Sequence, residues 1–282
     1  MNKKELPSDD QFACLIGRLN LSSLTGAKII LWLVAITVVS FAIGFGILAI
    51  TGDLSPSAGH RGSPFIASAM VSPNTTVFAL DRSTAGAVRI TMGAGELTVH
   101  GGAPAGTLME SRVFSTAPEW QPEYLQSTNG TVMTVSMTDP GHTGKEWFSV
   151  DSPNVWEVAL AEDAPISLDA KLGAGDCTLT LGTLNLTGLS LNTGAGETLV
   201  DLGGYRGEVF SGTIHQGVGD LTVRIPRESN TRIVINQGIG DLETRGLVPT
   251  GNAYTTPHFN PAGANTEIFI HQGVGDILVE AI

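Results

Sequence analysis

The chain has 282 residues, a formal net charge of −12 and 35 glycines, and only 15% of its residues are charged. This composition is too apolar for a disordered chain. The basic residues do not cluster, which argues against nucleic acid as a partner because phosphate binding needs a basic face.

The first predicted element is a transmembrane helix. Residues 29–50 are 22 consecutive residues without a charge, and as a helix they would rise about 33 Å, enough to cross a hydrocarbon core of roughly 30 Å. A cleaved signal peptide fits less well, because its apolar run is usually about 7–15 residues long. We therefore expect a short cytoplasmic tail over 1–27 and a membrane helix over 28–51.

The basic residues around this segment predict its orientation. Four of them precede it and only Arg61 follows it closely, which favours a cytoplasmic N-terminus. The protein is thus expected in the cell membrane as a single-pass protein, with its C-terminal domain outside the cytoplasm. Residues 52–84 are rich in Ser, Pro, Gly and Thr, which is typical of a flexible linker.

An internal repeat dominates residues 85–282. A unit of Gly, an apolar residue, Gly and then Asp or Glu occurs six times, with its first glycine at positions 93, 173, 194, 217, 238 and 273. The shortest steps between copies are 21 to 23 residues. Repeats of this length indicate stacked structural turns that bury a common core.

The aligned copies show apolar and polar residues in alternation, as expected for strands with one buried face. One apolar column lies just before each corner, and two more follow the acid. The second of these lies two residues after the first. The first column after the acid contains Leu97, Cys177, Thr198, Leu221, Leu242 and Ile277. We expect both glycines of each unit to allow positive φ at a tight corner. The sequence predicts an all-β fold, a β-solenoid with turns of about 21 residues and G-x-G-D corners on one N-terminal transmembrane helix.

The same columns predict the positions of two residue types that can carry chemistry, cysteine and histidine. Cys177 takes the place of Leu221 and Leu242, which predicts a buried thiol. Because Cys177 and Cys14 lie on opposite sides of the apolar segment, a secreted disulfide scaffold is excluded. His215 and His271 share a column with Thr, Lys and Asn, so we interpret them as solvated or ladder-forming surface residues.

The corner acids raise an alternative that involves a metal. Asp176, Asp220, Asp241 and Asp276, with Glu197, are expected to form a row along the stack. Calcium prefers such oxygen ligands, although the nine-residue calcium-binding repeat is absent. The local role of these acids is to accept a hydrogen bond from a corner amide. We otherwise predict no metal, no cofactor and no catalytic residues, because motifs of nucleophilic, phosphate-binding or metallohydrolase sites are missing.

Residues 101–170 interrupt the repeat. Strand-like alternation occurs at 124–126, 131–137 and 155–161, and three of the four tryptophans lie here, at Trp120, Trp147 and Trp156. We favour strands that extend or cap the stack over an aromatic ligand-binding patch.

These residues resemble a known family. The run NVWEVALAEDAPISLDAKLGAGDCTLTLGTLNLTGLSLNTGAGETLVDL (Asn154–Leu202) resembles the toast-rack domain, and HQGVGDLTVRIPRESNTRIVINQGIGDL (His215–Leu242) is similar to the C-terminal domain of LiaF-type cell-wall-active antibiotic response proteins. The resemblance implies a β-solenoid at a prokaryotic cell envelope, and some members modulate envelope-stress signalling. This chain has one predicted membrane helix where LiaF-type proteins carry several.

The most direct prediction of function is a non-enzymatic, membrane-anchored envelope protein. Three roles stay open: an envelope-stress signalling modulator, an adhesin-like interaction module, and an acidic spacer or surface scaffold. The first two imply another membrane or envelope protein as the partner. The alternative is a carbohydrate-binding or carbohydrate-active β-helix protein, which would place carboxylates together beside a groove.

Overall fold

The computed structural model describes residues 73–80, 83–115, 120–140, 154–205, 207, 209–263 and 265–282. Regular structure in these ranges consists of β-strands, which confirms the all-β class. Across these ranges, no helix has the length and apolar character needed to cross a membrane. The predicted tail over 1–27, the membrane helix over 28–51 and most of the predicted linker lie outside the described residues.

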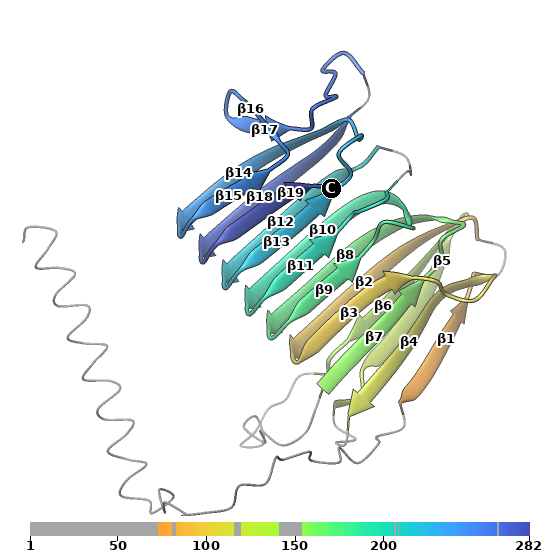
Figure 1. The fold of residues 1–282 in the computed structure, drawn as a ribbon. Coiled ribbons are helices and arrows are strands. Elements are labelled where there is room, and N and C mark those ends of the chain that lie inside the picture. The colour runs from red at the N-terminus through yellow and green to blue at the C-terminus, as the bar shows by residue number, and fades with distance from the viewer. Residues whose placement is uncertain are drawn as a thin grey trace, which may run out of the picture. The chain divides into compact units, whose positions relative to one another are not determined.

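The strands form two sheets (Figure 1). The nine-stranded sheet has the order β1 (Asn74–Ala79), β4 (Thr107–Ser115), β7 (Asn154–Leu160), β3 (Glu96–Gly101), β9 (Cys177–Thr180), β11 (Thr198–Asp201), β13 (Leu221–Ile225), β19 (Ile277–Ala281) and β15 (Leu242–Arg245). The ten-stranded sheet has the order β16 (Val248–Thr250), β17 (Ala253–Thr255), β14 (Thr231–Ile239), β18 (Thr266–Val274), β12 (Ser211–Val218), β10 (Asn185–Ala195), β8 (Pro165–Ala174), β2 (Ala85–Ala94), β6 (Val132–Thr138) and β5 (Glu123–Asn129).

Each G-x-G-D unit is the corner between the two sheets. It joins a strand of the ten-stranded sheet to a strand of the nine-stranded sheet, and we call each joined pair a coil. The six coils are β2–β3, β8–β9, β10–β11, β12–β13, β14–β15 and β18–β19. Neighbouring coils pair in parallel and in register, so that Leu191 lies beside Ile214 and Ile214 beside Ile270. All three are fully buried between the sheets, as the column alignment predicts.

The two glycines of a corner have different roles. The second one takes positive φ, for example +125° at Gly219, as expected. The first one does not, and the expectation for it was wrong. It is glycine because the neighbouring coil passes too close: a Cβ at Gly217 would lie 2.4 Å from the carbonyl oxygen of Gly194. The first glycine therefore permits close stacking, and the second permits the turn.

The coils do not stack in the order of the chain. The last coil, β18–β19, lies between β12–β13 and β14–β15 (Figure 1). The segment that separates it from β15 contains the β16–β17 hairpin, which pairs with β14 at Arg232 and Ile233. The chain thus passes the terminal coil β14–β15 and returns to fill the place beside β12–β13.

Residues 101–170 extend both sheets. Strands β4 and β7 continue the nine-stranded sheet and β6 and β5 continue the other, so the three predicted strands are confirmed. Trp156 is fully buried and donates a hydrogen bond to Asn154 (2.9 Å), which gives it a packing role. Trp147 lies outside the described residues.

The N-terminal side of the domain also differs from expectation. Strand β1 pairs with β4 over residues 74–79, inside the range predicted as a flexible linker. The linker therefore does not reach residue 84. Phe78 of this strand packs against Tyr124 of β5, with ring centroids 5.3 Å apart, so β1 is part of the folded domain. We call this end of the stack, where β1 and β5 meet, the closed end.

Replacement of Gly219 by Val should lower the free energy of unfolding by more than about 3 kcal/mol. Its φ is +125° and a Cβ would lie 2.0 Å from the carbonyl oxygen of Gly196. Replacement of His215 by Ala, two residues before the first corner glycine of the same coil, should change the free energy of unfolding by less than about 0.5 kcal/mol. Thermal or denaturant unfolding of the purified full chain measures both, and equal effects would contradict the column assignment.

Removal of residues 266–282 should release the terminal coil. Among the described residues β15 pairs only with β19, and β14 pairs mainly with β18. The amide hydrogens of residues 231–245 should therefore lose their exchange protection, while those of β8 and β10, which keep both neighbouring strands, should retain theirs. Hydrogen exchange read by mass spectrometry compares the two chains. Full protection of 231–245 in the truncated chain would show that β14–β15 does not depend on the inserted coil.

Candidate functional site

A groove of about 840 Å³ crosses the outer side of the ten-stranded sheet beside the corners. Its floor contains the first corner glycines of five coils, Gly173, Gly194, Gly217, Gly273 and Gly238. No side chain fits at these positions, because a Cβ would lie 2.2–2.5 Å from a carbonyl oxygen of the neighbouring coil. The close stacking of the coils therefore leaves a strip without side chains. We call this the corner groove.

One row of polar side chains borders the glycine strip. It lies two residues before the glycines, one member from each coil, and in spatial order it contains Thr91, Lys171, Asn192, His215, His271 and Asn236. The members occupy in-register positions on adjacent parallel strands, so they repeat at the strand spacing of about 4.8 Å.

The two histidines of this row stack on each other. Their ring centroids lie 4.7 Å apart with an interplanar angle of 13°, and the Nδ1 atom of His271 lies 3.4 Å from the side-chain nitrogen of Asn236. His215 is exposed and His271 is half-buried. The prediction of a ladder-forming surface column is confirmed.

A row of glutamines lies beneath the groove, and sequence reasoning missed it. Gln216 and Gln272 are 3% and 5% exposed, and each donates through its side-chain nitrogen to the carbonyl oxygen of the second corner glycine in the neighbouring coil. Gln237 makes the same contact to Gly275 (2.7 Å). The recurrent Gln before the corner was the available signal. These bonds satisfy carbonyl groups that the tight corner turns away from the sheet.

The corner acids form the expected row, and three of them accept hydrogen bonds from the neighbouring coil. Asp176 accepts a hydrogen bond from the amide of Glu197 (3.2 Å), Asp220 from the amide of Asp276 (3.1 Å), and Asp276 from the amide of Asp241 (2.9 Å). The predicted local role as amide acceptors is confirmed.

Calcium at these acids stays an alternative drawn from sequence. In the part of the chain that the structure describes, no group of three or more His, Cys, Asp or Glu side chains is placed to hold a metal ion. Asp220, Asp276 and Asp241 are instead linked to one another by hydrogen bonds from amide to carboxylate, and Asp176 is linked in the same way to Glu197.

An exposed apolar row follows the glycine strip at the corners of the last three coils in the stack. Val218, Val274 and Ile239 lie in register on adjacent strands and are 53%, 44% and 70% exposed. The corresponding residues of the first three coils are the smaller Ala94, Ala174 and Ala195. The corner groove therefore has polar groups on one side and, at one end, apolar groups just beyond its floor.

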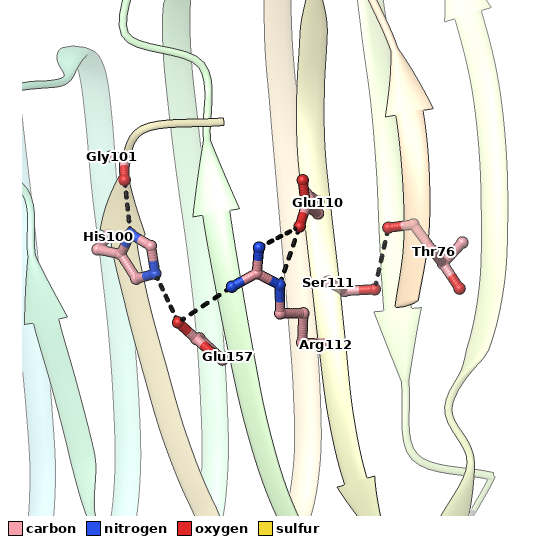
Figure 2. A network of polar contacts seen from close by, with 7 residues as sticks. All are labelled: Thr76, His100, Gly101, Glu110, Ser111, Arg112 and Glu157. Atoms are coloured by element: carbon pink, nitrogen blue, oxygen red, sulfur yellow. Dashed lines mark hydrogen bonds and ion pairs between the residues drawn. The ribbon is translucent and has the colours of Figure 1, made fainter. Parts of the chain in front are cut away.

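The outer face of the nine-stranded sheet carries a different set of polar contacts (Figure 2). Glu157 on β7 lies 3.3 Å from the Nε2 atom of His100 on β3 and 3.9 Å from Arg112 on β4. Arg112 also bonds Glu110 of its own strand at 2.7 Å. These half-exposed ion pairs connect three neighbouring strands, and such pairs contribute little individually. Their structural role is to place basic side chains beside acidic ones on the outer face of the strands at the closed end.

Cys177 lies in the core at 1% exposure, as predicted. Burial raises the pKa of its thiol to about 12, because the apolar surroundings disfavour the thiolate. The thiolate is the nucleophilic form, so this side chain is chemically inert at neutral pH.

Residues 67–224 match the family described as the N-terminal domain of toast_rack, DUF2154, over more than half of the chain. The chain belongs to the toast-rack family. The resemblance seen in the repeat is thereby confirmed. The similarity to LiaF-type proteins stays a prediction.

A solved structure shares this fold. A candidate cell adhesion protein of Clostridium sporogenes aligns with a TM-score of 0.69 and 23% identity, over 74% of this chain and all of its own. A candidate adhesin of Bacteroides fragilis aligns over 73% of this chain and 96% of its own, at 11% identity and a TM-score of 0.27. The curated proteins include no significant match to this chain. The Clostridium sporogenes alignment speaks for the fold alone, and the TM-score of the Bacteroides fragilis alignment is too low to support a conclusion.

The buried thiol gives a direct test of the core assignment. In a Cys14→Ser chain, labelling of Cys177 by iodoacetamide at pH 8 should be undetectable in the folded state and should appear in parallel with unfolding, as denaturant is added. Labelling that is complete below the unfolding transition would place Cys177 outside the core.

Proposed function

We propose that this toast-rack protein is a non-enzymatic, adhesin-like module of the cell envelope that binds an extended neutral glycan in the corner groove. The apolar segment 29–50 anchors it to the membrane and the domain lies outside the cytoplasm. The observation that carries the proposal is the repetition of one polar side chain per coil along a strip free of side chains. A ligand in this groove meets the same kind of contact at regular intervals, which suits a polymer with a repeated unit.

The direction of the groove favours a glycan over a peptide. A peptide that binds a β-protein usually adds a strand at a sheet edge and uses main-chain hydrogen bonds. The corner groove runs across the strands, whose backbone groups are already paired within the sheet. What it offers are the side-chain amides of Asn192 and Asn236, a hydroxyl and imidazoles, which are suitable partners for sugar hydroxyl groups.

The charges in and near the corner groove favour a neutral polymer as the ligand. Lys171 is the one side chain in the described lining that is permanently charged. The acids Asp220, Asp276 and Asp241 follow the floor glycines by three residues on the neighbouring corners, and they would repel a polyanion. The overall charge of −12 acts in the same direction.

The same lining supports binding over hydrolysis. Glycoside hydrolysis uses two carboxyl groups about 5–10 Å apart beside the scissile bond. Among the described residues that line the corner groove there is no Asp or Glu, and the corner acids that the structure pairs accept hydrogen bonds from the amides of neighbouring corners. The carbohydrate-active alternative therefore has less support than the carbohydrate-binding one.

Binding to insoluble neutral glycans tests the proposal. The detergent-purified full chain should be retained by chitin or cellulose, and Asn192→Ala/His215→Ala should weaken retention by at least about tenfold, because it removes two adjacent contacts of the row. The matched control is Ser211→Ala/Thr213→Ala, which changes the next two outward positions on the strand of His215 and keeps Ser190, the side chain that accepts a hydrogen bond from Asn192 (3.5 Å). Equal loss in both variants, or no retention by any neutral glycan, would contradict the proposal.

A signalling role stays a prediction from the family resemblance. It requires a second membrane protein that contacts this domain or its cytoplasmic tail. Crosslinking in intact cells followed by purification should recover such a protein reproducibly if the role is correct, and this outcome does not depend on the residues of the corner groove.

A further inference from the structure

The stack of coils is closed at one end and open at the other. At the closed end, β1 and β5 are the edge strands of the two sheets, and Phe78 of β1 packs against Tyr124 of β5 between the sheets. At the other end, β15 pairs only with β19, and β14 pairs with β17 at just Arg232 and Ile233. Within the described part of the chain, residues 234–239 and 242–245 thus have no strand partner on their outer side. We call these residues the open end.

The open end also exposes positions that are core elsewhere. In the column that follows the corner acid, Leu97, Cys177, Thr198, Leu221 and Ile277 are at most 3% exposed, whereas Leu242 is 37% exposed. Ile235 is half-buried, while its equivalents in the other five coils are fully buried. The two sheets therefore end with apolar side chains that lack a further layer. Repeat proteins normally need a polar cap at this position.

A ladder of alternating charge leads to the open end along the nine-stranded sheet. Arg224 lies 3.6 Å from Asp201 on one neighbouring strand and 2.7 Å from Glu280 on the other. Glu280 in turn lies 4.0 Å from Arg245 on β15. The sequence of charges from β11 to β15 is negative, positive, negative and positive. The next strand in this sheet is therefore expected to place a carboxylate beside Arg245.

We propose that the open end is the interface for a second copy of this chain, with β15 of each copy paired antiparallel about a two-fold axis near Thr244. Residues at equal distances from the axis then face each other, so Glu243 of each copy faces Arg245 of the other. Strand β15 is self-complementary in charge, and each Arg245 receives the carboxylate that continues the ladder. In one copy Glu243 and Arg245 pair with each other at 2.8 Å and are 60% and 58% exposed, so pairing of the two strands exchanges this exposed contact for one between copies.

The apolar side chains fit the same arrangement. Leu242 and Thr244 belong to columns that point between the sheets, and antiparallel pairing keeps them on the inner side in both copies. A two-fold interface of this kind uses the same patch on both subunits. It also removes an exposed sheet edge that would otherwise recruit unrelated strands.

Charge reversal separates this proposal from docking of another protein. The full chain in detergent should be a dimer by light scattering. Arg245→Glu places like charges opposite each other twice and should weaken the dimer by at least about tenfold. The exchange Glu243→Arg/Arg245→Glu keeps the self-complementarity and should return the dissociation constant to within about threefold of the original.

A mixing experiment tests the symmetry. Glu243→Arg alone and Arg245→Glu alone should each dimerise poorly, but an equimolar mixture should form the mixed dimer, because one strand is then wholly basic and the other wholly acidic. Thr244→Cys should form a disulfide between copies under mild oxidation. A monomer at every concentration tested, or a dimer that is insensitive to all of these changes, would overturn the proposal.

Arg112→Glu is the matched control. Arg112 pairs with a glutamate two residues earlier on its own strand, as Arg245 does, but at the closed end (Figure 2). The Arg112→Glu variant should leave the dimer unchanged. Glycan retention by the corner groove should also persist in the monomeric Arg245→Glu variant, so failure of the dimer and failure of the proposed glycan binding are read separately.

Discussion

Contact between the backbones of corner glycines in adjacent coils sets the geometry on which the rest of the domain depends. A Cβ at Gly173, Gly194, Gly217, Gly238 or Gly273 would lie within 2.5 Å of a neighbouring carbonyl oxygen. With the glycines in place, the coils stack in register, the inner columns close on one another, and the outer side is left with a smooth strip. The fold and the candidate binding site are therefore two results of one steric constraint.

The polar groups of the corner reinforce this stacking without competing for a ligand. The glutamines below the strip donate to glycine carbonyl groups of the next coil, and the acids accept from its amides. Both sets bind along the stack and are occupied by the structure itself. The row that contains Asn192, His215 and Asn236 points outward and is left for contacts with other molecules. Apart from Lys171, the chemistry that this row offers a ligand is hydrogen bonding by uncharged groups, which suits recognition.

The sequence predicted the repeat, the corner positions, the inner columns and the burial of Cys177, because all of these follow from side-chain periodicity within one coil. It could not predict the order of the coils. Every coil presents the same in-register surface, so β18–β19 fits beside β12–β13 as well as beside β14–β15. For the same reason Leu242 looked like a core residue. Its exposure depends on which coil is last in space, and that is a property of the long connection through β16–β17.

The position of the inserted coil has a consequence for synthesis of the protein. The strands at residues 231–245 leave the ribosome before residues 266–281, on which they dock. At a synthesis rate of roughly 5–20 residues per second, the partly made domain spends seconds with β12 and β13 as its uncovered edge and with two strands waiting for their neighbour. This interval is when a chaperone, or another nascent chain, has access to the stack.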